Sequence, residues 1–272
     1  MHTLFQSLSA VPTQVRWLFY LAWVASVIIF VAGTLNRISI WRRGDAERQS
    51  LMTGRGLLGL LWLSLSKVFS LDCLLARRAF ARSPVRGLML ISVEWTTLLL
   101  LLAVIASGVN LVYPLPFLAG QSQLVVAMIL DYAGGAMLIG LLFSIGRRYV
   151  FPPERTISVR SDAILLGLFA LIVFFAFMLE GARLAPVGWA MFPWWPVGTM
   201  FGQALVFVTK SPANAWSLAY PWFYLVHAGL AFVLFAYLPF SKLFHLFAAQ
   251  ITTAAARERK LARQGRRVAA TA

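Results

Sequence analysis

Five long apolar runs along the chain predict five helices that each cross a membrane. Each run has about twenty residues with few charges, which is the length a helix needs to span a hydrocarbon core about 30 Å thick. The runs fall at about residues 17–36, 88–111, 124–145, 163–182 and 217–240. The pattern therefore predicts an all-α integral membrane bundle of five transmembrane helices.

A sixth apolar stretch, at about residues 56–76, has a weaker pattern. Lys67 and Asp72 interrupt it, and arginines flank it on both sides. Leucine and valine recur at helical spacing along one side, while glycine and serine fall on the other, as in an amphipathic helix that lies in the membrane interface. We expect one interfacial helix here, and a sixth transmembrane helix is the alternative.

Composition agrees with a membrane protein. Of the 272 residues, 60% are hydrophobic and only 12% are charged, which is not the profile of a soluble domain. No polar or low-complexity linker divides the chain, so we expect a single domain over residues 1–272. A single cysteine, Cys73, excludes an internal disulfide framework and an iron–sulfur cluster bound only by cysteines of this chain.

Lysine and arginine are distributed unequally between the two sides of the membrane. Ten fall in residues 37–86, four in 147–160 and seven after residue 241, six of them in a basic tail at about 246–272. The connections on the other side hold only Arg16, Arg183 and Lys210. Basic loops stay in the cytoplasm, so we expect the N-terminus outside and the C-terminus in the cytoplasm. The basic residues therefore lie beside the membrane, and we expect the net charge of +15 to serve contacts with membrane lipids and not with nucleic acid.

Two histidines mark the last predicted span. His227 lies inside it, and His245 follows eighteen residues later, beyond Pro239. On a continuous helix eighteen residues return to the same face and rise about 27 Å, so the two imidazoles would lie near opposite sides of the membrane. This suits two stacked metal cofactors better than one shared metal. Pro239 is the residue that would bend the helix and disturb the register.

The two histidines differ in how easily they are explained by structure alone. A histidine at the end of a span can extend its ring to water, which is a sufficient explanation for His245 beside Lys242. A polar ring inside a span is expensive to bury and usually marks a functional site, so His227 is the stronger candidate.

The connection between the fourth and fifth predicted spans is rich in proline and tryptophan. One interpretation is a belt of aromatic side chains at the level of the lipid head groups. The other is the wall of a quinone pocket, because a flat ring with polar edges is bound by aromatic packing and a few hydrogen-bond donors. The sequence leaves both open. The tryptophans are Trp189, Trp194, Trp195, Trp216 and Trp222.

Several short segments resemble one family of membrane proteins. The segment HAGLAFVLFAYLPFSKLFH, residues 227–245, resembles the last helix of the respiratory nitrate reductase gamma subunit. Relatives of that subunit include membrane cytochromes of heterodisulfide-reductase-like complexes and of complexes associated with dissimilatory sulfite reduction. The resemblance includes the histidine spacing and the Pro-Phe-Ser-Lys turn between the histidines. Four further segments agree in the expected order: RSPVRGLM (82–89), GRRYV (146–150), FMLEGARLA (177–185) and WPVG (195–198).

The resemblance implies a five-helix subunit with two b-type haems stacked across the bilayer. Such a subunit passes electrons between the quinone pool, menaquinone or ubiquinone, and a cytoplasmic iron–sulfur oxidoreductase subunit. His227 would bind the outer haem and His245 the haem on the cytoplasmic side, each opposite a histidine of the second helix. The location implied is the cytoplasmic (inner) membrane of a bacterium.

The second helix departs from the family pattern at both expected ligand positions, which are occupied by Leu90 and Leu100. The remaining histidine, His2, lies near the N-terminus, so one copy of this chain cannot supply two histidines to each of two haems. Three interpretations stay open. Each haem has an empty or different second axial position, with Met89 as a candidate thioether ligand; a partner subunit supplies the ligands; or the haems are lost.

Three carboxylates fall within or near the predicted spans, where a charge is expensive unless it is paired or functional. We expect Glu180 to pair with Arg183 three residues later. Asp131 and Glu180 are also placed for proton transfer at the outer side. Glu94 lies one turn from Leu90 and has no assigned role.

These features predict a membrane subunit of a respiratory redox complex that carries electrons through haem on His227 and His245 and is not a complete enzyme alone. The alternative is a haem-free membrane anchor that recruits the cytoplasmic redox partner. A transporter fits less well, because five spans without an internal repeat provide no midplane site of the usual kind.

Overall fold

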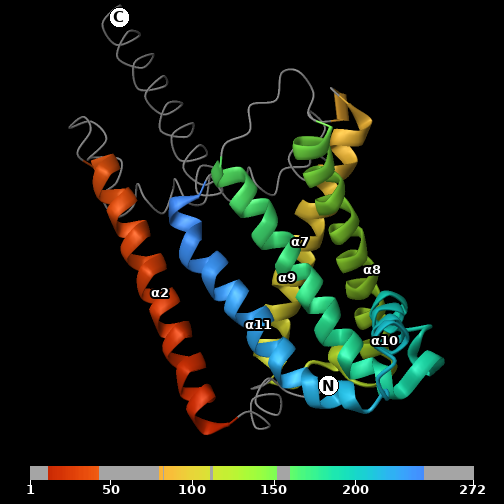
Figure 1. Cartoon of the computed structure of the whole chain (residues 1–272). Helices are drawn as coiled ribbons and strands as arrows, with labels where there is room; N and C mark the ends of the chain where they lie inside the picture. Colours follow the sequence, from red (N-terminus) through yellow and green to blue (C-terminus); the bar gives the residue numbers. More distant parts are fainter. Residues whose placement is uncertain (1–11, 43–79, 82, 111–112, 152–159, 242–272) are drawn as a thin grey trace, which may run out of the picture. The chain divides into compact units, whose positions relative to one another are not determined.

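The computed structural model describes residues 12–42, 80–81, 83–110, 113–151 and 160–241, and the regular structure in this part of the chain is helical throughout (Figure 1). The all-α prediction is confirmed there. The α-helices are α2 (Thr13–Arg42), α7 (Pro84–Asn110), α8 (Gly120–Ile145), α9 (Arg160–Leu184), α10 (Pro196–Thr209) and α11 (Ala215–Tyr237). Short 3₁₀ or π turns follow as η1 (Pro116–Leu118), η2 (Gly146–Val150), η3 (Ala185–Met191) and η4 (Leu238–Phe240).

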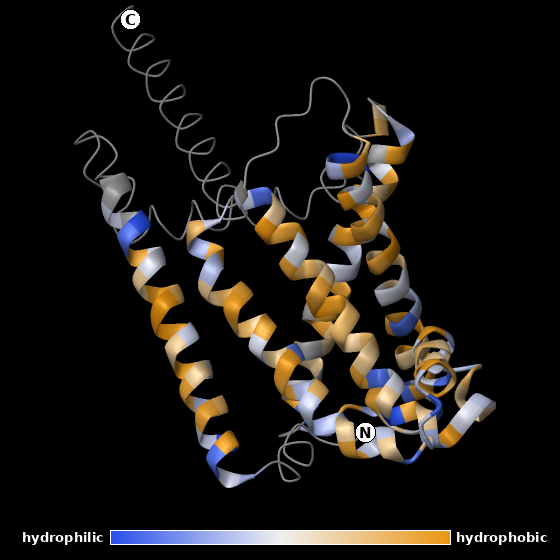
Figure 2. Cartoon of the chain, in the orientation of Figure 1, coloured by the Kyte–Doolittle hydropathy of each residue, from blue (hydrophilic) through white to orange (hydrophobic). Residues whose placement is uncertain are grey.

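Within the described residues, four helical segments are long and apolar enough to cross a membrane, as expected of a multi-pass membrane protein. Figure 2 shows the apolar residues that run along each of them. They are Thr13–Arg37, Gly120–Val150, Ser161–Met191 and Ala215–Phe240. The remaining expected span falls on α7, which has 27 residues, and its passage through the membrane stays a prediction. The interfacial helix expected at 56–76 lies outside the described residues.

The chain divides into two compact units, and the boundary between them cuts through α2 and α11. The first unit contains Met1–Val24 and Ala76–Leu234, and the second contains Ala25–Leu75 and Phe235–Ala272. The expectation of a single domain over the whole chain stays a prediction.

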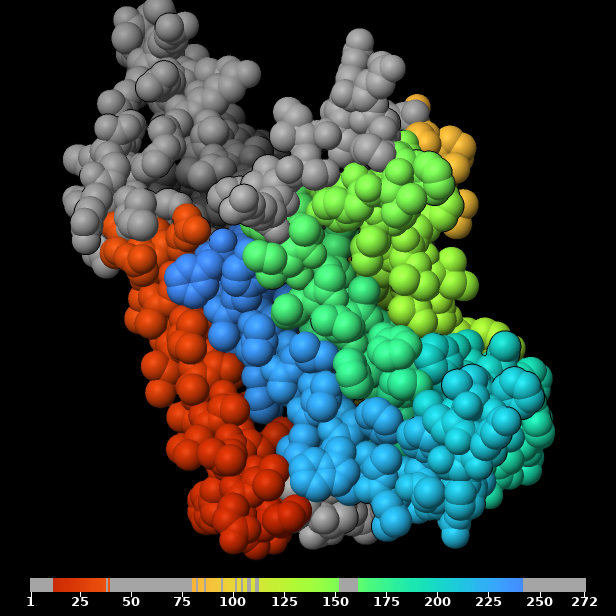
Figure 3. Space-filling view, viewed as in Figure 1, coloured from red at the N-terminus to blue at the C-terminus, as the bar shows by residue number. Residues whose placement is uncertain are grey.

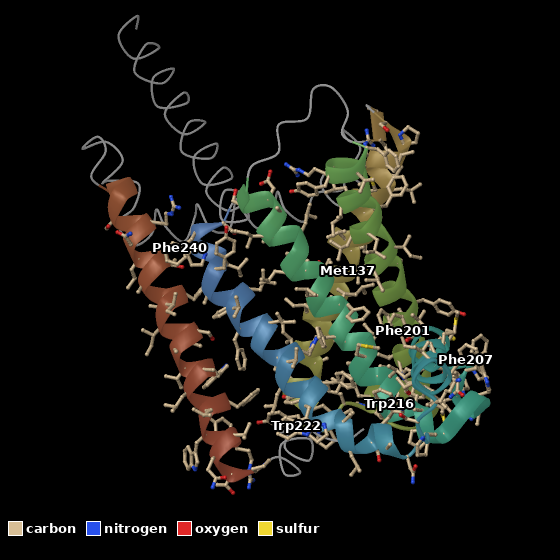
Figure 4. The ribbon with its side chains drawn as sticks, in the orientation of Figure 1. Met137, Phe201, Phe207, Trp216, Trp222 and Phe240 are labelled. Atoms are coloured by element: carbon tan, nitrogen blue, oxygen red, sulfur yellow. The ribbon has the colours of Figure 1, made fainter. Side chains whose placement is uncertain are left out.

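The core of the first unit lies between α8 and α9. Met137 and Leu141 of α8 and Val173 and Phe177 of α9 are each at most 5% exposed and pack together. The ring of Phe177 stacks on Phe201 of α10, with centroids 5.1 Å apart; Figure 4 labels Met137 and Phe201. Aromatic stacking and apolar burial therefore join α8, α9 and α10 into one packed group.

Helix α10 was not expected from the sequence, which places its residues in a connection. Its 14 residues rise only about 21 Å, too little to span the hydrocarbon core. Pro196 occupies the first helical turn, where its missing N–H is tolerated and its fixed φ favours helix. Helix α10 ends at Thr209, and the next residue, Lys210, has a φ of 54° that places it in the left-handed region.

Two glycines allow α9 and α10 to approach closely. A Cβ on Gly202 would lie 2.7 Å from the carbonyl oxygen of Gly181, and a Cβ on Gly181 would lie 2.8 Å from the amide nitrogen of Gly202. Both contacts are with backbone, which cannot rotate away. The two helices can therefore keep this crossing only with glycine at both positions.

We expect Gly202→Ala to destabilise the fold by about 1–3 kcal/mol, because the added methyl group forces α9 and α10 apart. The midpoint of unfolding in mixed detergent micelles, followed by circular dichroism, measures the change. Gly229→Ala in α11 is the matched control, since a Cβ there meets nothing within 4 Å and helix propensity favours alanine. Equal midpoints for the two variants would contradict the close crossing.

In the second unit, one face of α2 packs on the end of α11. Phe30 stacks on Phe235 with ring centroids 4.3 Å apart and an interplanar angle of 18°. A Cβ on Gly33 would lie 2.9 Å from the Pro239 Cβ. The Nε–H of Arg37 donates a hydrogen bond of 3.2 Å to the carbonyl oxygen of Pro239. The three α2 residues have i, i+3, i+7 spacing, so they lie on the same side of the helix.

Candidate functional site

His227 lies within the apolar part of α11 and faces α9. Its Nδ1 is 2.9 Å from the carbonyl oxygen of Ile172. A carbonyl oxygen only accepts hydrogen bonds, so Nδ1 must carry the proton and donate. In a neutral ring the lone pair is then on Nε2. Histidines that bind a metal use this arrangement, with one ring nitrogen fixed by a backbone carbonyl and the other free to coordinate.

Aromatic side chains continue this contact between α9 and α11. Phe175 of α9 lies next to Phe223 of α11, with ring centroids 6.4 Å apart. Figure 3 shows the side chains of α9 (green) and α11 (blue) in contact. Phe19, in the first part of α2, approaches Tyr224 and Phe232 of α11 at 5.9 and 5.1 Å. The half-buried imidazole of His227 is therefore restrained because α11 packs against both α9 and α2.

The helix that carries His227 does not continue unbroken to His245, and it ends just before the proline that was expected to disturb the register. Helix α11 ends at Tyr237, η4 follows, and Ser241 is extended with φ −87° and ψ 167°. Pro239 explains this end, because it has no N–H for the helical ladder and its ring clashes with the preceding turn. His245 lies outside the described residues, and its place near the cytoplasmic side stays a prediction.

The two leucines at the expected ligand positions of the second helix have different surroundings. Leu90 is 47% exposed. Leu100 packs against the core cluster of α8 and α9, so it fills space beside the core with apolar atoms. Met89 is partly buried on α7, and its role as a thioether ligand stays a prediction. Among the described residues no three His, Cys, Asp or Glu side chains form a metal-binding group.

Asp131 has a structural role that the sequence did not indicate. Its carboxylate, on α8, accepts the backbone N–H of Val197 at 2.7 Å and of Gly198 at 2.9 Å. These N–H groups belong to the first turn of α10 and have no partner within their own helix. The negative charge also matches the positive end of the helix dipole. At 6% exposure, this buried carboxylate is satisfied by capping α10 from another helix.

The predicted pairing of Glu180 with Arg183 is confirmed. The guanidinium of Arg183 donates to the Glu180 carboxylate at i,i+3 spacing on α9. It also lies over the ring of Trp195, 4.9 Å from the centroid, in a cation–π contact. Glu180 lies beside Gly198, and Asp131 contacts the same residue. One cation–π contact and two capping bonds thus hold the start of α10, and the ion pair joins two residues of α9 beside it. Proton transfer by Asp131 and Glu180 stays a prediction, and the side chain of Glu94 is outside those described.

No local pattern in the sequence indicates the cap of α10. Asp131 and Val197 are 66 positions apart, and Asp131 stands in an apolar run that offers its carboxylate no neighbouring partner. The one usable clue is the expense of a charge within a span, which requires some partner. Here the partner is a pair of backbone N–H groups at a helix start, which no side-chain pattern marks.

Comparison with known proteins supports the resemblance on which the haem interpretation rests. The family model described as nitrate reductase gamma subunit matches residues 111–263, more than half of the chain. No solved structure matches the chain.

Three curated proteins are similar to the chain. The EtfAB:quinone oxidoreductase of Syntrophomonas wolfei is 25% identical over 87% of this chain and 33% of its own length. One subunit of the dihydromethanophenazine:CoB–CoM heterodisulfide reductase of Methanosarcina acetivorans is 28% identical over 67% of this chain and 62% of its own. An Hdr-like menaquinol oxidoreductase cytochrome b-like subunit of Archaeoglobus profundus is 30% identical over 50% of this chain and 38% of its own. The chain thus spans between a third and two thirds of each relative.

Proposed function

Because the chain belongs to the nitrate reductase gamma subunit family, we propose that it is the membrane subunit of a redox complex. In this proposal it passes electrons between the quinone pool and a cytoplasmic iron–sulfur oxidoreductase by means of b-type haem. The names of two relatives, a quinone oxidoreductase and a menaquinol oxidoreductase subunit, support a quinone as the electron-carrying substrate. The complex would lie in the cytoplasmic membrane of a bacterium, with the N-terminus outside.

The single observation that carries the proposal is the hydrogen bond from His227 Nδ1–H to the Ile172 carbonyl, at 2.9 Å. It leaves Nε2 of a ring inside an apolar span as a free ligand, and it fixes the orientation of that ring against α9. His227 would therefore hold a haem, which would supply one-electron redox chemistry when bound. The role of this chain would be to hold and orient the haem through His227 and to shield it partly from solvent.

Helix α7 contains no histidine that would serve as a second ligand to such a haem. Leu100 contributes to core packing and Leu90 is exposed, and neither offers a ligand atom. Met89 or a residue of a partner subunit would complete the coordination. A haem on the cytoplasmic side held by His245 is the corresponding proposal for the other leaflet.

The cytoplasmic partner would dock on the basic segments. Residues 37–86 and the tail after residue 241 hold 17 of the 24 lysines and arginines. Opposite charge would attract an acidic iron–sulfur subunit and increase its rate of association. The same segments would contact anionic lipid head groups.

A second candidate function is a haem-free membrane anchor that recruits the redox partner. The packing of Leu100 into the core favours it, because an apolar side chain occupies a position where a haem ligand belongs in the family. The two candidates differ in whether the purified protein binds haem.

A reduced-minus-oxidised difference spectrum of the purified full chain tests the proposal. We expect a b-type haem signal, with at most one haem for His227 and one for His245. A protein that folds and inserts in membranes but has no haem signal, even when co-produced with its soluble partner, would leave the anchor as the function.

A further inference from the structure

Helix α10 packs against the middle of two membrane-spanning segments. The side chain of Val197 lies over Gly135 of α8, where an added Cβ would be 3.0 Å from Cγ2 of the valine. The ring of Phe201 stacks on Phe177 of α9. Gly135 and Phe177 are near the centres of the apolar segments that α8 forms with η2 and α9 forms with η3. The first two turns of α10 therefore lie alongside these segments and not beyond their ends (Figure 1).

An ion pair gives the depth of these contacts. The guanidinium of Arg148 donates to the carboxylate of Asp162, and a charged pair of this kind belongs at the boundary of the hydrocarbon core. Gly135 precedes Arg148 by 13 residues and Phe177 follows Asp162 by 15 residues, which are rises of about 20 and 22 Å. In a core about 30 Å thick, both contacts of α10 then lie about 8–10 Å below the opposite surface.

The backbone at the start of α10 has protein partners throughout. A helix start leaves four N–H groups without partners in the helix. Trp195, at the N-cap position, donates to the Met191 carbonyl at 3.0 Å. Pro196 has no N–H, and the next two groups donate to the Asp131 carboxylate. The hydrocarbon core provides no water to backbone groups, so a helix that begins inside it requires this arrangement.

The exposed face of α10 is apolar. Met200, Phe207 and Val208 are 56%, 83% and 75% exposed; Figure 4 labels Phe207. With the exposed Ala204 they have i, i+4, i+7, i+8 spacing, which places them on one side of the helix. The helix has no charged residue, and Lys210 follows directly after its end. A helix that faces water has the opposite pattern, with polar side chains outward.

We propose that α10 is a re-entrant helix in the leaflet away from the Arg148–Asp162 pair, and that acyl chains of membrane lipids cover its exposed face. Gly188, whose φ of 67° interrupts η3, allows the chain to turn back after α9. The occupant is lipid because the face is apolar, lies at hydrocarbon depth and ends at the exposed cation Lys210, which suits the phosphate of a head group. The chain thus enters the membrane where the sequence predicts a connection outside it.

Spin labels on α10 test this placement. Phe207→Cys and Met200→Cys, each in a Cys73→Ser background, carry a nitroxide on the full chain in vesicles of phosphatidylethanolamine and phosphatidylglycerol. Power saturation then compares collisions with oxygen, which dissolves in hydrocarbon, and with the polar complex nickel-EDDA, which stays in water. We expect high oxygen accessibility at both positions and nickel accessibility roughly tenfold lower than in water, because a polar solute is expensive to transfer into hydrocarbon.

Two positions of α8 provide matched controls. Ile139→Cys reports lipid, because Ile139 is 70% exposed and lies nine residues from Arg148, about 14 Å into the core. Gln121→Cys reports water, because the exposed Gln121 is 27 residues from Arg148, a rise of about 40 Å that exceeds the core thickness. Helical content by circular dichroism checks that each labelled variant is folded.

Each outcome at Phe207 and Met200 decides the question. Accessibilities like those of Ile139 support a lipid-covered helix. Nickel accessibility like that of Gln121 shows that α10 lies in water, and low accessibility to both quenchers shows that a protein surface covers it; either result overturns the inference. None of these results depends on haem or on quinone, so the function proposed above stands or falls separately.

Discussion

His227→Ala is expected to remove haem from its site, with a fall in occupancy of more than about tenfold. Changing an outer-shell partner of a metal-bound histidine already costs roughly 10- to 100-fold in affinity, and removing the ligand itself should cost more. The difference spectrum of the purified variant, together with haem extraction and quantification, measures the loss. Added imidazole should restore part of the signal, because it can occupy the space that the side chain leaves.

Two other histidines provide the comparison. His2→Ala should keep the full haem content, since this residue lies near the N-terminus and outside the predicted spans. His245→Ala should leave the His227 signal in place, and a redox titration would separate the two sites by midpoint potential. Unchanged haem content in His227→Ala would refute His227 as a ligand.

Asp131→Ala should destabilise the fold by about 3–5 kcal/mol. The substitution removes two hydrogen bonds between a buried carboxylate and backbone N–H groups, and each such bond to a charged group contributes about 1.5–3 kcal/mol. It also leaves the N–H groups of Val197 and Gly198 buried without a partner. Denaturation in mixed micelles measures the loss. Hydrogen exchange at the first turn of α10 should accelerate more than exchange in α8.

Asp131→Asn separates the cap from the charge. The amide oxygen keeps one acceptor, so we expect about half of the loss seen with alanine. Thr97→Ala is the control for a polar substitution in a membrane helix, because the exposed Thr97 hydroxyl bonds only the Val93 carbonyl of its own helix. If Asp131→Ala were as stable as Thr97→Ala, the cap would not contribute to the fold.

Hydropathy predicted the membrane helices well because it measures the apolar length that matches the bilayer. The span expected at 124–145 became α8, Gly120–Ile145, and that at 163–182 became α9, Arg160–Leu184. The helix expected at 17–36 extends to Thr13–Arg42, since a helix that has formed in the bilayer continues into polar residues at its ends. Hydropathy therefore locates the hydrocarbon core but not the helix ends.

The parts of the site that the sequence predicted are local, and those it missed depend on distant contacts. Glu180 and Arg183 are one turn apart, so helical spacing alone predicts their ion pair. The inward placement of His227 follows from the cost of a polar ring in lipid. In contrast, the capping of α10 by Asp131 and the bond from His227 to Ile172 join residues 66 and 55 positions apart. Their pairing depends on how helices pack, which local patterns do not encode.

The hydrogen bond between Arg37 and Pro239 can form only late in the synthesis of the chain. Its two residues are separated by 202 positions, so the carbonyl left free at the end of α11 receives its donor only after almost the whole chain has been made. Until then the first span is in the membrane without its final neighbour, and the long loop between them adds entropy to closing the pair. A ribosome that stops before residue 239 therefore leaves an N-terminal segment whose apolar face, Phe30 and Gly33, is open to quality-control proteases and chaperones.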